Sequence, residues 1–344
     1  MGRVTISSVA ELAKVDLSTV SRVLNQSFDN HKYAPATIER IKKAAEELGY
    51  QPSYAARSLR TGKTMLLGVV VADIGNPFFS ELASQLGNSI DKYGYRMVIS
   101  STNENPKRQR EHIDSMLAYR VDGLIVAPCG PDGLSKVRRA GVPIVTIDRP
   151  LPDSEFPFVG IDNTAAGKLL AEKLSGCGYS RVGVVVPEGK TDITLQDRLQ
   201  GLSSGLNKDD IGIAWIIRVP STSDMRDEVR IAVGRKLKEV DSMPDAIVGM
   251  TNVCTLGILQ ALEDLDFGWS NSLGLAGIDD FAAASLVRPA VSVVSQPLSR
   301  IASEASALLF NHMKSDDGRK QHESILVDPE WIERKSLPCV SQVE

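Results

Sequence analysis

The chain has 344 residues, of which 42% are hydrophobic and 24% charged, a composition and length typical of a globular protein with two or three domains. No run of 18 or more apolar residues occurs, which excludes a membrane-spanning helix, and the N-terminus lacks a signal-peptide core, so we expect a cytoplasmic protein. The net charge of −4 is unevenly distributed. Residues 1–63 carry ten Lys/Arg and six Asp/Glu, whereas the remainder carries 29 Lys/Arg and 37 Asp/Glu. A basic N-terminal part on an acidic body is the charge distribution expected when the N-terminal part binds nucleic acid.

Residues 4–25 predict two short helices joined by a tight turn. On a helical projection at 100° per residue, one arc of the second helix is suited to burial and holds Thr19, Val20, Val23 and Leu24. The other arc carries groups suited to phosphates and base edges: Leu17, Ser18, Ser21, Arg22 and Asn25. This is the helix-turn-helix arrangement, although the pattern alone also fits an amphipathic helix in an ordinary bundle.

A third helix is predicted from Pro35 to Leu48, because apolar residues recur on one face and Gly49 follows. Residues 52–59 (PSYAARSL) are compatible with one more short helix, but eight residues are too few for a stable isolated helix in water. Residues 60–63 form a link to the rest of the chain.

The remaining chain alternates predicted strands and helices. Leu66–Ala72 is a continuous apolar run, typical of a buried parallel strand. Further strands are expected at Met97–Ser101, Gly123–Ala127, Ile144–Ile147, Val182–Val186, Ala214–Val219, Ala246–Gly249 and Leu273–Gly277, with helices at about Pro77–Tyr93 and Lys107–Tyr119. Repeated βαβ units in two sets predict an α/β protein with two doubly wound parallel lobes behind a small all-α headpiece.

Several motifs occur in a characteristic order along the chain: VTI at 4–6, VA at 9–10, TVSRVLN at 19–25, ELGYQP at 47–52, ARSLR at 56–60, DIGNPFF at 73–79 and VDGL at 121–124. With these motifs the chain closely resembles the LacI/GalR family of bacterial transcription regulators over almost its whole length. The resemblance implies a DNA-binding headpiece, a hinge, and an effector core of the periplasmic-binding-protein type that binds a small molecule between two lobes.

The resemblance also implies roles for residues that contact DNA. Leu17, Ser18 and Arg22 fall where the family reads bases in the major groove. Phosphate contacts fall at Thr5, Thr19, Ser21 and Asn25. In the hinge helix, Ala56 and Leu59 face the minor groove, where a leucine can part a base step and kink the duplex.

The headpiece departs from the family pattern at several positions, of which two bear on the ends of its helices. Lys14 replaces the usual turn glycine at a position that needs a positive φ, which should cost stability of order 1 kcal/mol. Ala34 lacks the capping hydroxyl often found before the third helix.

The family organisation implies domain boundaries. We expect a headpiece at 1–50, a hinge and linker at 51–63, and an effector-binding and dimerisation core at 64–341. Within the core, the first lobe is expected at about 64–161 and 294–322, and the second at about 162–293 and 323–341.

The effector site is predicted beyond the carboxyl ends of the strands, where open parallel sheets bind ligands. The candidates, each matching a ligand-contact position of the family, are Asp73, Asn76, Phe78, Phe79, Asp148, Arg149, Thr194, Arg198, Asn252 and Asp279. The side chains of Arg198 and Asp279 are suited to bind paired hydroxyl groups or a carboxylate of a small molecule. Phe79 fits ring stacking and core packing equally. Arg149 favours an anionic ligand group, unless Asp148 neutralises it.

We predict no cofactor, no metal site and no catalysis. The four cysteines form no CxxC pair and are interpreted as small buried hydrophobic residues, and the histidines lack metal-ligand spacing. No GxGxxG follows a strand, and neither GxxxxGK[ST] nor GxSxG occurs. The expected partners are a near-palindromic DNA operator, a carbohydrate-related effector and a second copy of the chain. A sugar-binding protein or an α/β enzyme without a DNA role is the alternative.

Overall fold

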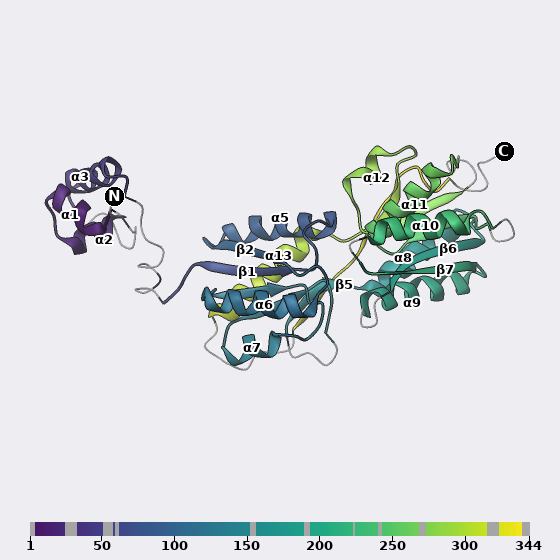
Figure 1. Cartoon of the computed structure of the whole chain (residues 1–344), viewed down its shortest axis with the longest axis horizontal. Coiled ribbons are helices and arrows are strands. Elements are labelled where there is room, and N and C mark those ends of the chain that lie inside the picture. Colours follow the sequence, from purple (N-terminus) through teal and green to yellow (C-terminus); the bar gives the residue numbers. More distant parts are fainter. Residues whose placement is uncertain are drawn as a thin grey trace. The chain divides into compact units, whose positions relative to one another are not determined.

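A computed structural model describes residues 4–24, 33–50, 58, 62–151, 156–188, 193–222, 224–239, 243–267, 273–314 and 323–338. The chain divides into two compact units, Met1–Met65 and Leu66–Glu344. The first is a small helical headpiece and the second a larger α/β unit (Figure 1), as the sequence predicts. In the described part of the chain, no helix is both long enough and apolar enough to cross a membrane.

In residues 4–24 and 33–50, three helices pack around a small apolar core. They are α1 (Ile6–Ala13), α2 (Leu17–Leu24) and α3 (Pro35–Glu47). Val9, Val20 and Ile41, one from each helix, are fully buried where the helices meet. Arg40 of α3 donates a hydrogen bond of 2.9 Å to the carbonyl oxygen of Ala13, which ties α3 to the end of α1. The three predicted helices are therefore confirmed.

The first lobe of the larger unit is a six-stranded sheet in the order β11-β5-β4-β3-β1-β2, in which every adjacent pair is parallel. Its strands are β1 (Leu66–Val71), β2 (Arg96–Ser101), β3 (Gly123–Val126), β4 (Ile144–Ile147), β5 (Phe158–Ile161) and β11 (Ser324–Val327). Its helices are α5 (Pro77–Asp91), α6 (Pro106–Ala118), α7 (Leu134–Arg139) and α13 (Leu298–Lys314). Figure 1 shows α5 and α13 on one face of this sheet and α6 and α7 on the other, which explains why β1 is apolar along its length.

The second lobe is also a six-stranded sheet, in the order β12-β10-β9-β8-β6-β7. Its strands are β6 (Arg181–Glu188), β7 (Gly212–Pro220), β8 (Ala246–Gly249), β9 (Gly274–Ile278), β10 (Ser292–Ser295) and β12 (Glu330–Ile332). Its helices are α8 (Asn163–Gly176), α9 (Ile193–Lys208), α10 (Met225–Lys236), α11 (Asn252–Asp264) and α12 (Ala282–Leu286). The sheet is parallel as predicted except at its edge, where β12 runs antiparallel to β10.

The backbones of α8 and α9 approach so closely that a Cβ atom on Gly167 would overlap the carbonyl oxygen of Arg198. Only glycine fits at such a contact. The contact therefore fixes the backbone from which the Arg198 side chain projects.

The chain crosses between the lobes after β5, after β10 and after β11, and this pattern corrects the predicted lobe boundaries. β10 pairs with β9, so residues 294–295 belong to the second lobe rather than the first. β11 pairs with β5, so residues 324–327 belong to the first lobe rather than the second. The final return to the second lobe comes only with β12.

Candidate functional site

The exposed face of α2 carries the residues that the sequence predicts to read bases. Val20 and Val23 are buried, whereas Ser18 and Arg22 are exposed. Leu17 is 49% exposed although it is apolar. A leucine and an arginine on one exposed helical face suit a thymine methyl group and a guanine edge in the major groove. The division of α2 into two faces is the one predicted from the sequence.

The predicted phosphate contacts Thr5, Thr19 and Ser21 belong to the same helix pair. The Thr5 hydroxyl also accepts a hydrogen bond of 3.4 Å from the Ser8 backbone N–H, so Thr5 caps α1 as well. Three further predicted DNA contacts, Asn25, Ala56 and Leu59, lie outside the described residues.

Lys14 is the C-terminal cap of α1, and its backbone is left-handed, with φ 54° and ψ 50°. The sequence analysis predicts this positive φ, because Lys14 replaces the usual turn glycine of the family. Its backbone N–H donates to the carbonyl oxygens of Ala10 and Glu11. A β-carbon is unfavourable in this conformation, so the turn between α1 and α2 is strained at Lys14.

We expect Lys14→Gly to stabilise the headpiece by about 1 kcal/mol, because glycine adopts positive φ without steric cost. Hydrogen exchange of the α1 and α2 amides in the full chain measures this as slower exchange. Lys42→Gly in the exposed interior of α3 is the matched control and should destabilise by a similar amount. Faster exchange in Lys14→Gly would show that Lys14 is not strained.

A cleft of about 940 Å³ lies between the two lobes of the larger unit. All ten predicted effector residues line it: Asp73, Asn76, Phe78, Phe79, Asp148, Arg149, Thr194, Arg198, Asn252 and Asp279. They follow the carboxyl ends of β1 and β4 in the first lobe and of β6, β8 and β9 in the second. A cavity of this size suits a small molecule.

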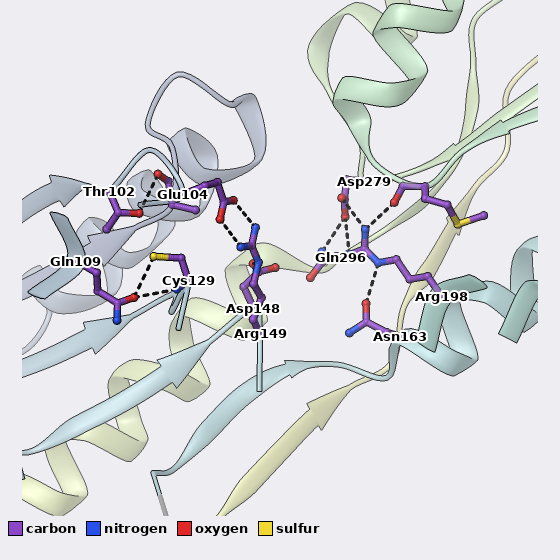
Figure 2. Close-up of polar contacts among 12 residues, drawn as sticks. Thr102, Glu104, Gln109, Cys129, Asp148, Arg149, Asn163, Arg198, Asp279 and Gln296 are labelled. Carbon is purple, nitrogen blue, oxygen red and sulfur yellow. Dashed lines mark hydrogen bonds and ion pairs between the residues drawn. The ribbon is translucent and has the colours of Figure 1, made fainter. Parts of the chain in front are cut away.

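Arg198 lies at the centre of a buried network on the second-lobe wall (Figure 2). Its guanidinium donates to both carboxylate oxygens of Asp279, at 3.0 and 3.4 Å, and the two side chains are only 5% and 7% exposed. It also donates 2.8 Å to Asn163 Oδ1 and 2.9 Å to the Met250 carbonyl oxygen. Gln296 Nε2 donates 2.7 Å to Asp279. The bidentate partner of Arg198 is therefore Asp279, which orients it toward the cleft.

Arg149 occupies the opposite, first-lobe wall, where carboxylates surround it. Its two terminal nitrogens donate 2.6 Å each to the two oxygens of Glu104. Its Nε lies 3.3 Å from Asp148 Oδ2. The neutralisation by Asp148 considered from the sequence is therefore present, and Glu104 adds to it.

Among the described residues, a hydrogen bond joins the two walls directly. Asn252 Nδ2, at the start of α11, donates 2.8 Å to Asn76 Oδ1, which also caps α5 by accepting from the Phe78 N–H. Beside it, the rings of Phe78 and Phe79 lie edge-to-face with centroids 4.9 Å apart. Phe79 is only 3% exposed, so most of its ring packs in the core and only a small part reaches the cleft.

Comparison with known proteins finds similarity along almost the whole chain. Residues 5–53 match the family model for bacterial regulatory proteins of the lacI family, and residues 67–313 match the periplasmic binding protein domain. The HTH-type transcriptional regulator KdgR of Bacillus subtilis is 30% identical over 341 residues, covering 98% of both chains. The chain belongs to the lacI family. It is thus a DNA-binding transcriptional regulator with a periplasmic-binding-protein-like effector domain.

Solved members of the lacI family share this fold over nearly the full length. The Lac repressor dimer bound to operator and the anti-inducer ONPF superimposes with a TM-score of 0.82 at 21% identity, covering 97% of this chain and 99% of that one. The complex of the transcriptional regulator CelR with cellobiose gives a TM-score of 0.68 at 24% identity, with 97% and 100% coverage.

The cleft of this lacI-family chain also contains residues that the sequence analysis missed. Glu104 lies just beyond β2, and Cys129 just beyond β3. The Cys129 thiol donates 3.4 Å to Gln109 Oε1, and its backbone N–H donates 2.8 Å to the same oxygen. The carboxyl-end rule, applied to β2 and β3 as well, is the signal that finds them.

The cysteines differ from the prediction that all are buried. Cys254 is buried, but Cys129 and Cys177 are half-buried, and Cys129 faces the cleft. Burial raises the pKa of the Cys254 thiol to about 12. Burial also raises the pKa of the Cys129 thiol, which keeps it neutral at pH 7. Cys339 lies outside the described residues.

Proposed function

We propose that this regulator is a repressor whose operator affinity is controlled by a small molecule in the cleft between the lobes. The observation that carries the proposal is the convergence of ten predicted effector residues on one cleft of a chain that also has a DNA-reading headpiece. Leu17, Ser18 and Arg22 read bases, and Arg198 and Asp279 hold the ligand. The effector is a sugar or sugar derivative, as in the CelR–cellobiose complex.

The working unit is a cytoplasmic homodimer on a near-palindromic operator, because a two-fold protein matches a two-fold site. The Lac repressor dimer on its operator supports this arrangement. Ligand binding favours one arrangement of the lobes and changes how the two hinges approach DNA. A useful switch needs affinities for the two states that differ by a few kcal/mol. The ligand is returned unchanged, because the relatives are regulators rather than enzymes.

A thermal-shift screen against sugars, sugar phosphates, sugar acids, nucleobases and amino acids tests this proposal. A ligand at about 100 times its Kd stabilises the protein by about 2.7 kcal/mol. The hit should be weakened in Asp73→Asn, within the cleft, and unchanged in Asp91→Asn, which pairs with Arg96 at the surface. A flat screen of a protein that still binds DNA would contradict control by these ligand classes.

A further inference from the structure

The first-lobe wall of the cleft holds an arginine whose charge is already matched. Arg149, Glu104 and Asp148 have side chains that are 22%, 32% and 10% exposed. Both terminal guanidinium nitrogens of Arg149 are engaged by Glu104, in the parallel geometry that an anionic ligand would otherwise take (Figure 2). With Asp148 alongside, two carboxylates face one guanidinium. The group carries a net negative charge rather than the positive charge of an anion-binding site.

The Glu104 side chain is positioned by a turn whose backbone conformation is unfavourable for glutamate. Asn103 and Glu104 have φ of 51° and 56°, so two successive residues are left-handed. Asparagine tolerates this conformation, whereas it is unfavourable for a glutamate. The turn is fixed by the Asn103 N–H, which donates 2.6 Å to the Ala72 carbonyl oxygen at the end of β1. Such strain persists only where surrounding contacts impose it, and here it directs the carboxylate to Arg149.

The second-lobe wall repeats the pattern with different residues. The Arg198 guanidinium donates four hydrogen bonds to described residues. Two go to the Asp279 carboxylate, one to Asn163 Oδ1 and one to the Met250 carbonyl oxygen. A guanidinium has five N–H donors, so these contacts leave at most one for a ligand and no bidentate site. Arg198 can therefore bind a hydroxyl oxygen but not clasp a carboxylate or phosphate.

Among the described lining residues of the whole cleft, carboxylates outnumber guanidinium groups two to one. The six carboxylates are Asp73, Glu104, Asp148, Asp224, Asp227 and Asp279, and the three arginines are Arg149, Arg198 and Arg226. Like charges confined to a cleft of low dielectric repel an incoming anion strongly.

We infer that Glu104 is a charge filter, which occupies Arg149 so that the cleft accepts uncharged polyhydroxylated ligands and rejects their acid forms. The inference rests on the proposed function and deepens it, because it separates neutral sugars from sugar acids and sugar phosphates. It also predicts that the cleft binds acids more tightly when this one carboxylate is neutralised. Glu104→Gln would remove the negative charge beside Arg149 and replace the two-oxygen acceptor of its terminal nitrogens by a single amide oxygen, a weaker partner for the guanidinium than a ligand carboxylate.

Matched neutral and acidic probes test the filter by calorimetric titration. We use D-glucitol against D-gluconate and D-galactose against D-galacturonate, on the full-length wild type, Glu104→Gln and Glu104→Gln/Arg149→Met. The wild type should show no saturable binding of either acid. Glu104→Gln should bind at least one acid about tenfold or more tightly than the wild type, as expected when a like charge is removed from a binding site. The double variant should lose this gain.

Glu111→Gln is the control for net charge, because Glu111 is exposed on α6 and does not line the cleft. It should leave acid binding unchanged. Acid binding by the wild type that is lost in Arg149→Met would overturn the filter, and so would the absence of any gain in Glu104→Gln. Operator titrations with the same probes separate the two proposals. An acid that binds the wild type and changes its operator affinity contradicts the filter but supports the small-molecule regulator.

Discussion

Arg198→Ala is expected to lower the free energy of unfolding of the effector core by about 3–5 kcal/mol, because it leaves a buried carboxylate without its charge partner. Asp279 is 7% exposed, and its remaining described side-chain partner is Gln296. One amide hydrogen bond does not replace a bidentate ion pair. Urea denaturation followed by circular dichroism measures the change, and the same variant should lose ligand binding.

Two further variants show whether the unpaired charge is the cause. Arg198→Met/Asp279→Asn removes both charges and should be less destabilised than Arg198→Ala, since no carboxylate is left buried alone. Arg230→Ala breaks a surface pair with Asp264, whose side chains are 36% and 50% exposed, and should cost at most about 1 kcal/mol. A loss of that small size in Arg198→Ala would show that Asp279 is solvated in the variant and that the network is not an essential part of the fold.

Arg22→Ala is expected to weaken binding to the best operator by about 1–3 kcal/mol and to relax the preference at one base position. Arg22 is exposed on α2, and among the described residues its Nη1 donates a long hydrogen bond of 3.4 Å to the Tyr33 hydroxyl. The guanidinium can therefore turn to a guanine edge without losing a strong contact. In vitro selection supplies the operator, and fluorescence anisotropy on single-base variants measures the preference.

Lys43→Ala removes the same charge from an exposed position of α3 and should not alter the preference at any base. A phosphate contact contributes equally to all sequences, because the backbone carries no sequence information. If Arg22→Ala reduces affinity equally on every DNA variant, Arg22 is a phosphate contact and base reading belongs to Leu17 and Ser18.

Most of the fold could be predicted because long apolar periodicities and helix-start signals act locally. The helices that begin at Pro35 and Pro77 start where a proline at the first helical position predicts. The apolar run after Leu66 forms a buried strand. The strands β5, β10, β11 and β12 were missed. Their places depend on pairing with distant strands.

The sequence allowed us to predict which residues line the cleft, but not which of them form ion pairs with one another. The rule that ligands bind beyond strand ends located Arg149, Arg198 and Asp279. Their partners depend on the turns that follow each strand. The left-handed turn at Glu104, in particular, brings together residues 45 positions apart. A sequence shows that a carboxylate and an arginine exist, but only the folded turn shows that each satisfies the other.

The most direct test of the central claim is an operator titration of the wild-type chain with and without the ligand found by the thermal-shift screen, at fixed salt. The account predicts that saturating ligand moves the operator midpoint by a few kcal/mol, and that Asp73→Asn shifts the ligand concentration needed but not the affinity of the ligand-free protein for DNA. An operator midpoint that stays the same at saturating ligand, with binding to the cleft verified by calorimetry, would contradict the claim that the cleft controls the headpiece.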